Sequence, residues 1–223
     1  MSRYLDINAW KRREHFHFFK TYEQPFFTIC AEVDVTPFRH YCKAQQFSFF
    51  LTSLYLSTKA ANEVEPFRYR LRGEQVLVHD VIHAGSTVLL PNETFTFCYF
   101  DYTTNFYEFH ATAKQRLAQF SVGGQKFEPR DAHDDLLHYS MIPWITFTSF
   151  AHARKLHTED SVPKIVFGRY REAGGKTAMP VSVEVHHALL DGLHVGKFFE
   201  LFQGYLTQPE LHCCSQIEFS KRD

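Results

Sequence analysis

One stretch of alternating residues, PVSVEVHHA at 180–188, constrains the fold more than any other part of the chain. Successive side chains of a strand point to opposite faces of its sheet. One face therefore carries Val181, Val183, Val185 and His187, and the other carries Ser182, Glu184 and His186. An apolar face beside a polar face predicts a strand with one side in the core. It also places one of two adjacent imidazoles on each side.

Similar alternation predicts further strands along the chain, at 26–35, 68–72, 75–80, 95–102, 141–150, 164–172 and 179–185. Helical periodicity and capping residues predict helices at 47–62, 105–120 and 193–206. Another helix is expected with Thr36 as its N-cap and Pro37 as its first residue. Strands mixed with helices, several of them joined as hairpins, predict an α/β two-layer sandwich with a mainly antiparallel or mixed sheet.

No repeat, low-complexity tract or linker divides the 223 residues, and the longest polar break, at 122–135, is typical of one surface loop. We therefore expect a single domain over 1–223, with a disordered tail after about residue 208. The first residues lack an apolar signal segment, and the most apolar window, 47–61, is interrupted by serine and threonine. These features predict neither export nor a membrane span.

Composition narrows the class of partner. The formal net charge is −1, so no basic face is expected to attract nucleic acid or an anionic membrane. A small molecule or another protein chain is the expected partner. Five cysteines without CxxC spacing predict neither a disulfide framework nor a structural zinc site, and they indicate a reduced, cytoplasmic protein. The 24 Phe and 11 Tyr fill a Phe-rich core or line a pocket or subunit interface.

The pattern His-His-x-x-x-Asp-Gly, at 186–192, is rare enough by chance to count as a motif. Adjacent strand residues diverge, so His186 and His187 are poorly placed to bind one metal, and no metal site is expected. One interpretation is a buried histidine that is hydrogen-bonded within the core. The other is a histidine at the end of a buried strand, kept neutral by desolvation and able to take a proton from a hydroxyl or thiol.

The segment HHALLDGLHVGKF resembles the active-site signature of the chloramphenicol acetyltransferase family. Four more segments resemble landmarks of that family in the same order, at 10–19, 67–80, 92–97 and 142–150. The resemblance implies an α/β subunit assembled as a homotrimer, with active sites at the subunit interfaces. It also implies acetyl-CoA as co-substrate and no metal.

The resemblance further implies roles for individual residues. His187 is the expected general base, Ser140 the donor to the tetrahedral oxyanion, and Asp191 the partner of Arg12 in a buried structural ion pair. Coenzyme A is expected near Trp144, Phe150, Arg169 and Tyr170. From the residues alone, other interpretations stay open: a backbone contact for Ser140, a solvated charged run for Arg12, and plain core packing for the aromatic rings.

The expected acceptor site combines matches and departures. Phe19, Phe27, Phe95 and Phe127 match aromatic positions of the family's pocket. Phe26 and Phe97 are bulkier than the family's residues and are expected to fill pocket volume. Val166 stands where a threonine helps to position a water, and His138 and His152 replace residues of another character.

These features predict an acetyl-CoA-dependent O-acetyltransferase of the chloramphenicol acetyltransferase type, an antibiotic-resistance activity that transfers acetyl directly within a ternary complex. Chloramphenicol is the leading acceptor. The first alternative is the same mechanism with a different hydroxyl-bearing acceptor. The second is a ligand-binding homologue that has lost turnover.

Overall fold

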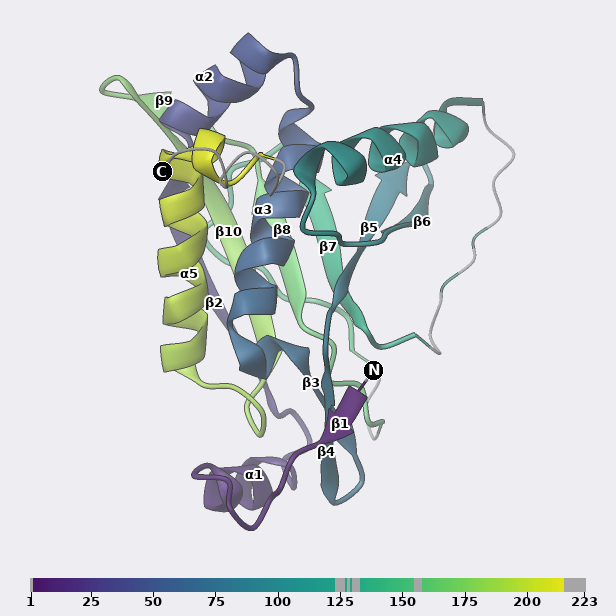
Figure 1. The fold of residues 1–223 in the computed structure, drawn as a ribbon, viewed down its shortest axis with the longest axis vertical. Helices are drawn as coiled ribbons and strands as arrows, with labels where there is room; N and C mark the ends of the chain where they lie inside the picture. The colour runs from purple at the N-terminus through teal and green to yellow at the C-terminus, as the bar shows by residue number, and fades with distance from the viewer. Residues whose placement is uncertain (1, 123–126, 128, 130–132, 155–157, 215–223) are drawn as a thin grey trace, which may run out of the picture.

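The computed structural model describes residues 2–122, 127, 129, 133–154 and 158–214. Its main element is a seven-stranded mixed sheet (Figure 1). The strand order is β2 (Phe26–Asp34), β10 (Lys176–His186), β8 (Lys164–Gly168), β7 (Leu136–Ile142), β5 (His83–Leu89) and β6 (Phe95–Phe100), with β9 (Arg171–Ala173) paired to β10. Strand β7 runs parallel to both of its neighbours, and the other pairs are antiparallel.

A second, three-stranded sheet and five α-helices complete the described structure. The small sheet consists of β1 (Ser2–Tyr4), β4 (Gln75–His79) and β3 (Tyr69–Arg72). The helices are α1 (Arg13–Phe19), α2 (Thr36–Gln45), α3 (Phe49–Glu63), α4 (Phe106–Ala118) and α5 (Gly192–Thr207). Short 3-10 turns cover Glu65–Arg68, Gln119–Val122 and Pro209–Leu211. Within the described ranges, each helix is too short or too polar to cross a bilayer.

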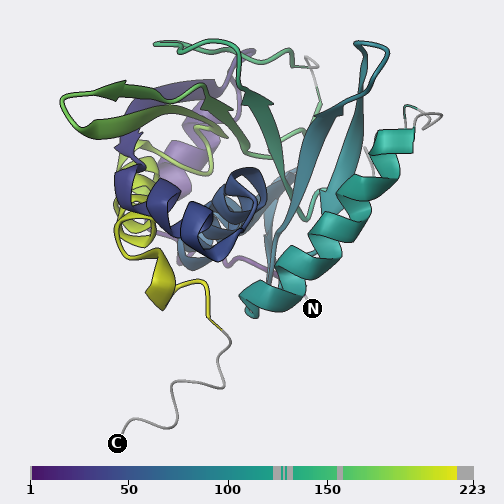
Figure 2. The same ribbon diagram turned by 90° about the horizontal axis from the view of Figure 1, so that it is seen from above.

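The two faces of the large sheet are covered differently. Helices α3, α4 and α5 lie on one face, and residues 143–154, which follow β7, run along the other (Figure 2). On β10, Val181, Val183 and Val185 are fully buried on the helix side. The predicted α/β sandwich with a mixed sheet is therefore confirmed, and we call the side opposite the helices the loop face.

The predicted strand at 141–150 is wrong. Strand β7 ends at Ile142 because Pro143, which has no backbone N–H, cannot continue the ladder. Residues 143–150 instead cross the loop face, where the Phe147 ring lies against Gly168 of β8. A Cβ at Gly168 would come within 2.8 Å of that ring, so glycine permits the close approach. The sequence patterns also missed β5, the strand that lies between β7 and β6 in the sheet.

The helix boundaries differ from the predictions by one or two residues. Thr36 is the first residue of α2 rather than its N-cap, and its hydroxyl instead accepts a hydrogen bond from Thr177 N at 2.7 Å. Ser48 caps α3 and Asn105 caps α4, each accepting from a backbone N–H three residues later. Asp191 caps α5, which begins at Gly192, one residue before the predicted start.

The chain stays packed beyond residue 208, where a disordered tail was expected. Residues Pro209–Leu211 form a 3-10 turn, and Cys213 is buried against the core. The expected tail is therefore wrong for 209–214, and 215–223 lie outside the described residues. All five cysteines are free thiols in this structure.

Candidate active site

His187 directly follows β10, and two backbone groups fix its position. Its own N–H donates to the Pro25 carbonyl at 2.7 Å, which extends the pairing between β10 and β2 by one residue. Its Nδ1 lies 3.1 Å from the Leu190 carbonyl oxygen. A carbonyl oxygen only accepts, so this contact assigns the proton to Nδ1. Nε2 is then left with a lone pair that can take a proton.

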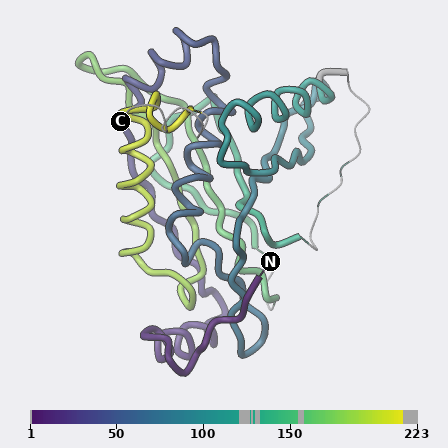
Figure 3. Tube along the Cα trace, in the orientation of Figure 1, coloured from purple at the N-terminus to yellow at the C-terminus, as the bar shows by residue number. Residues whose placement is uncertain are grey.

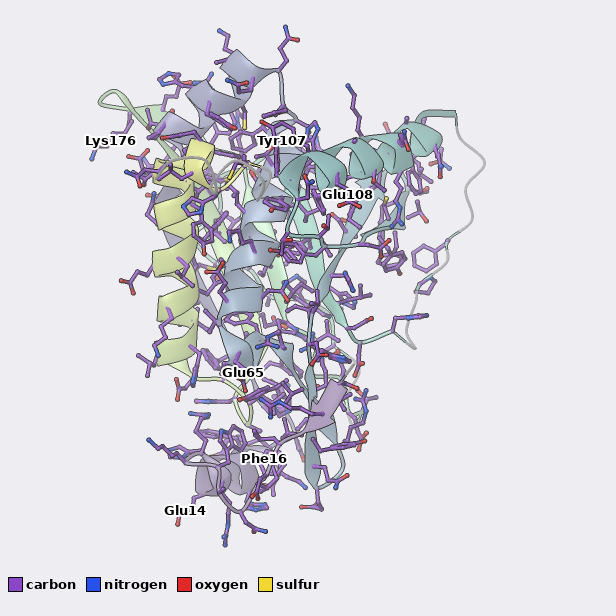
Figure 4. The ribbon with its side chains drawn as sticks, viewed as in Figure 1. Glu14, Phe16, Glu65, Tyr107, Glu108 and Lys176 are labelled. Atoms are coloured by element: carbon purple, nitrogen blue, oxygen red, sulfur yellow. The ribbon has the colours of Figure 1, made fainter. Side chains whose placement is uncertain are left out.

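Two aromatic rings hold the His187 imidazole. The Phe19 ring stacks on it with centroids 3.7 Å apart and planes 11° apart, and the Phe27 ring lies 4.7 Å away. Phe19 comes from α1, which packs beside the loop before α5 at one end of the molecule (Figure 3). Phe16 on α1 lies near one end of the molecule, far from Lys176 at the start of β10 (Figure 4). The imidazole is therefore half-buried and fixed in orientation within one chain.

Arg12 and Asp191 stabilise the loop that joins His187 to α5. Their side chains form an ion pair, and Arg12 Nη2 also donates to the His187 carbonyl at 3.1 Å. The Arg12 side chain is 13% exposed and that of Asp191 is 31% exposed, so the pair is only partly buried. Burial raises the pKa of Asp191, but the charges of His194 and Arg12 outweigh this and hold it below its usual value. The pair fixes the backbone around His187, and the Asp191 carboxylate contacts Arg12, His194 and the Leu193 N–H rather than the His187 imidazole.

Ser140 lies on the loop face, away from His187. The strand registers align one row of side chains across the sheet: Cys30, Ser182, Val166, Ser140, Thr87 and Phe97. His187 follows Ser182 by five residues along β10, and Ser140 lies two strands across from it. These offsets correspond to about 17 Å along the strand and about 10 Å across. One acceptor molecule cannot contact both side chains of the same chain.

The predicted acceptor residues fall into separate groups. Phe95, Phe97 and Phe127 form one cluster, with ring centroids 5.2–5.8 Å apart. Phe95 is 49% exposed and Phe127 is 61% exposed, so this cluster presents an open apolar surface. Phe19 and Phe27 lie instead around His187. Sequence position alone did not reveal that these two aromatic groups are far apart within one chain.

Phe26 and His152 line a third region, a cavity of about 760 Å³ on the loop face. Phe26 was expected to fill acceptor volume, but its ring lies 3.7 Å from the Arg154 guanidinium. Arg154 Nε donates to Glu184 at 2.6 Å, and Nη1 donates to Asp160 at 2.8 Å. The backbone N–H of His152 donates to the same Glu184 carboxylate. This cavity wall is therefore charged and internally paired.

Burial shifts several titratable groups on this face. Desolvation lowers the pKa of both His138 and His186 to about 4, with smaller contributions from neighbouring cations. Burial raises the pKa of Glu184, but hydrogen bonds and the Arg154 charge outweigh it and bring the value to about 2. Both histidines are therefore neutral near pH 7, while Glu184 is ionised. Val166 is fully buried between Ser140 and Ser182, so it lines no open surface of the single chain.

Of the four residues expected near coenzyme A, two line the same pocket. Arg169 and Tyr170 line a pocket of about 680 Å³ that also includes Pro143. Trp144 follows Pro143 and is largely exposed. Phe150 packs against His152, with centroids 4.8 Å apart, on the way to the charged cavity. The pocket therefore combines an exposed aromatic ring with a guanidinium group, which suits a nucleotide with phosphates.

A family model described as chloramphenicol acetyltransferase matches residues 2–203. The chain belongs to the chloramphenicol acetyltransferase family. Among curated relatives, the chloramphenicol acetyltransferases of Proteus mirabilis and Streptomyces acrimycini are 27% and 29% identical to it over 205 and 207 residues. Each of these matches covers 92% of this chain and 94% of the relative.

Solved structures agree with this family assignment. One chloramphenicol acetyltransferase superposes with a TM-score of 0.86 at 28% identity, covering 92% of this chain and all of the other. The dihydrolipoamide acetyltransferase of Azotobacter vinelandii shares the fold more distantly, with a TM-score of 0.66 at 14% identity. That match covers 89% of this chain and 87% of the other.

Some contacts in this member of the chloramphenicol acetyltransferase family were outside the sequence prediction. The Pro25 and Leu190 carbonyls orient His187, but backbone groups leave no signal in a sequence. Arg154 was also missed. The signal for it was Glu184, a carboxylate on the polar side of a buried strand, which requires a cationic or hydrogen-bonding partner.

Proposed function

We propose that this chain is an acetyl-CoA-dependent O-acetyltransferase with chloramphenicol as its acceptor and His187 as its general base. Family membership supports the reaction class. The observation that carries the catalytic assignment is the hydrogen bond from His187 Nδ1 to the Leu190 carbonyl. It leaves Nε2 free to accept a proton, which is the requirement for a base acting on a hydroxyl.

The reaction then needs no covalent enzyme intermediate. Nε2 of His187 takes the proton of the acceptor hydroxyl while the oxygen attacks the thioester carbon. The carbonyl oxygen becomes an oxyanion, and it reforms the double bond as the carbon–sulfur bond breaks. The leaving thiolate takes the proton back from Nε2, giving an acetyl ester and free coenzyme A. Phe19 and Phe27 keep the imidazole in one orientation throughout.

We assign the oxyanion donor to Ser140 of a neighbouring copy. Ser140 and His187 of one chain are too far apart to meet on one substrate, whereas a head-to-tail ring brings different surfaces together. A homotrimer of this type pairs the His187 end of one chain with the loop face of the next. The exposed cluster of Phe95, Phe97 and Phe127 supports this arrangement, because it offers an apolar surface in the same row of the sheet as Ser140.

Coenzyme A is assigned to the pocket beside Tyr170. The Arg169 side chain is exposed and without a side-chain partner among the described residues, so it is free to bind phosphate. Tyr170 and Trp144 offer ring faces for the adenine. We place the enzyme in the cytoplasm, where acetyl-CoA is available and free cysteines persist, and we propose antibiotic resistance as its role.

A second candidate is the same transfer to a different hydroxyl-bearing acceptor. The charged cavity formed by Phe26, Arg154 and Glu184 favours it, since a buried ion network suits a polar acceptor better than an apolar one. Phe97 adds a further ring to the apolar cluster.

A thioester-cleavage assay separates these possibilities. The purified enzyme is given acetyl-CoA with chloramphenicol, with a matched analogue lacking the acceptor hydroxyl, and with a panel of polar alcohols. Saturable thiol release with chloramphenicol, but not with the analogue or the other alcohols, supports the first assignment. Release only with other alcohols supports the second candidate. Binding of chloramphenicol or acetyl-CoA without thiol release would instead identify a ligand-binding homologue.

A further inference from the structure

Thr87 is the neighbour of Ser140 on β5. Strands β5 and β7 pair in parallel from His83 to Ser86, and this register brings Thr87 next to Ser140. The Thr87 hydroxyl lies 3.4 Å from Ser140 Oγ, in a geometry where Thr87 donates. Val166 flanks Ser140 on the other side and has no polar atom in its side chain.

This arrangement decides what the Ser140 hydroxyl can do. A serine hydroxyl has one proton and two acceptor lone pairs. Thr87 occupies one lone pair, and Val166 accepts nothing. Among the described residues, Thr87 is the one side chain that hydrogen-bonds Ser140, so the serine proton is uncommitted. It is therefore available to a group above the loop face.

A hydrogen bond received by a hydroxyl also makes its own proton a better donor, because linked hydrogen bonds polarise one another. Thr87 is well suited to hold this geometry, since β-branching restricts its χ1 angle. Its other neighbour in the row is Phe97 on β6, whose ring packs on Phe127. Thr87 on β5 therefore lies between Ser140 on β7 and Phe97 on β6.

We propose that Thr87 is a positioning residue that orients and polarises the Ser140 hydroxyl toward the oxyanion. The proposal rests on the proposed role of Ser140 in acetyl transfer. In this proposal Thr87 acts through Ser140.

The direct test is Thr87→Val, which keeps the shape of the side chain and removes its donor. The expected result is a fall in kcat of about 3–10-fold, the range that one modest hydrogen bond supplies. KM for acetyl-CoA and for the acceptor should stay within about twofold, because ground-state contacts are unchanged. Thr87→Ser restores the donor and should recover most of the lost kcat.

Ser182→Ala is the matched control. Ser182 lies in the same row on the far side of Val166, and its buried hydroxyl has no hydrogen-bond partner among the residues that the structure describes. Removing that hydroxyl should leave kcat unchanged. If Thr87→Val does not fold, as judged by thermal unfolding, Thr87→Ala carries the same comparison.

A double-mutant cycle with Ser140→Ala distinguishes the possible failures. In the Ser140→Ala background, Thr87→Val should lower kcat no further. An equal loss with and without Ser140 would overturn the proposal, as would wild-type kcat in Thr87→Val when Ser140→Ala is impaired. Full activity of Ser140→Ala would instead remove the proposed role of Ser140 and, with it, the basis for Thr87.

Discussion

The two histidines at the end of β10 are neighbours in sequence but have different surroundings. His186 is 3% exposed, lies under the loop face, and packs against the Phe26 ring. His187 is half-buried, stacked on Phe19, and bonded through Nδ1 to a carbonyl. One strand thus places one imidazole on the buried polar side of the sheet and the next against the rings of Phe19 and Phe27. Alternation along a strand can therefore separate a structural residue from a chemical one.

The largest effect expected from this comparison is on activity. His187→Ala should lower kcat/KM by about 10²–10⁴-fold, because it removes the base that takes the proton from the hydroxyl of the acceptor substrate. His186→Ala is the matched control and should alter stability more than activity. Steady-state kinetics with the thermal unfolding midpoint of each variant measure both quantities. More than a tenth of wild-type activity in His187→Ala would contradict the assignment.

The next effect concerns stability in acid. His186 has a folded-state pKa of about 4, against 6.5 for the free side chain. The unfolded chain therefore binds the extra proton first, so stability is full above pH 6.5 and falls as pH drops toward 4. The loss from this one group is about 3 kcal/mol, at 1.36 kcal/mol per pKa unit.

Urea denaturation at pH 7 and at pH 4.5 measures the combined loss from His186 and His138, whose pKa values are both about 4, and His186→Gln should remove the part that belongs to His186. Glu184, with its pKa of about 2, contributes below about pH 4.5 and so does not mask the test. An unchanged pH dependence in His186→Gln would show that another group governs acid sensitivity.

A smaller effect is expected for the ion pair behind His187. Because Asp191 is nearly a third exposed, solvent screens its attraction to Arg12. Arg12→Ala and Asp191→Ala should each destabilise the protein by about 1–3 kcal/mol, with a coupling energy of about 1 kcal/mol. Asp191→Asn keeps the cap on α5 and isolates the charge. Strict additivity of the two alanine substitutions would mean that the pair does not act as a unit.

The smallest effect concerns the acceptor surface. Phe97→Ala opens the cluster around Phe95 and Phe127, and it should raise kcat/KM for chloramphenicol by about 2–10-fold, chiefly through KM. Leu89→Ala, on the neighbouring strand, is the control for general loss of apolar surface. A higher KM in Phe97→Ala would show that this ring is a packing contact for the acceptor.

Local patterns predicted much of the fold. Alternation identified β10, and capping residues identified α5 through Asp191. The same reasoning failed at 141–150, because apolar residues that cover a sheet face resemble residues inside a sheet. Pro143 was the sequence signal for the end of the strand, whereas the close approach of Phe147 to Gly168 depends on tertiary packing.

The candidate site was predictable as a set of residues but not as an arrangement. The motif at 186–192 pointed to His187, and the family resemblance pointed to Ser140. Their separation depends on strand order and register, which join segments distant in sequence. The orientation of His187 depends on the Leu190 carbonyl, and no residue type encodes a backbone contact.

The central claim is that His187 of one chain and Ser140 of another share an active site. Subunits carrying His187→Ala are mixed with subunits carrying Ser140→Ala during assembly, and acetyl transfer by the mixture is measured. In a ring of three, every mixed assembly contains one site with both residues intact. Random mixing in equal amounts should therefore recover about one quarter of wild-type activity. Activity no higher than that of either variant alone would contradict a site shared between chains.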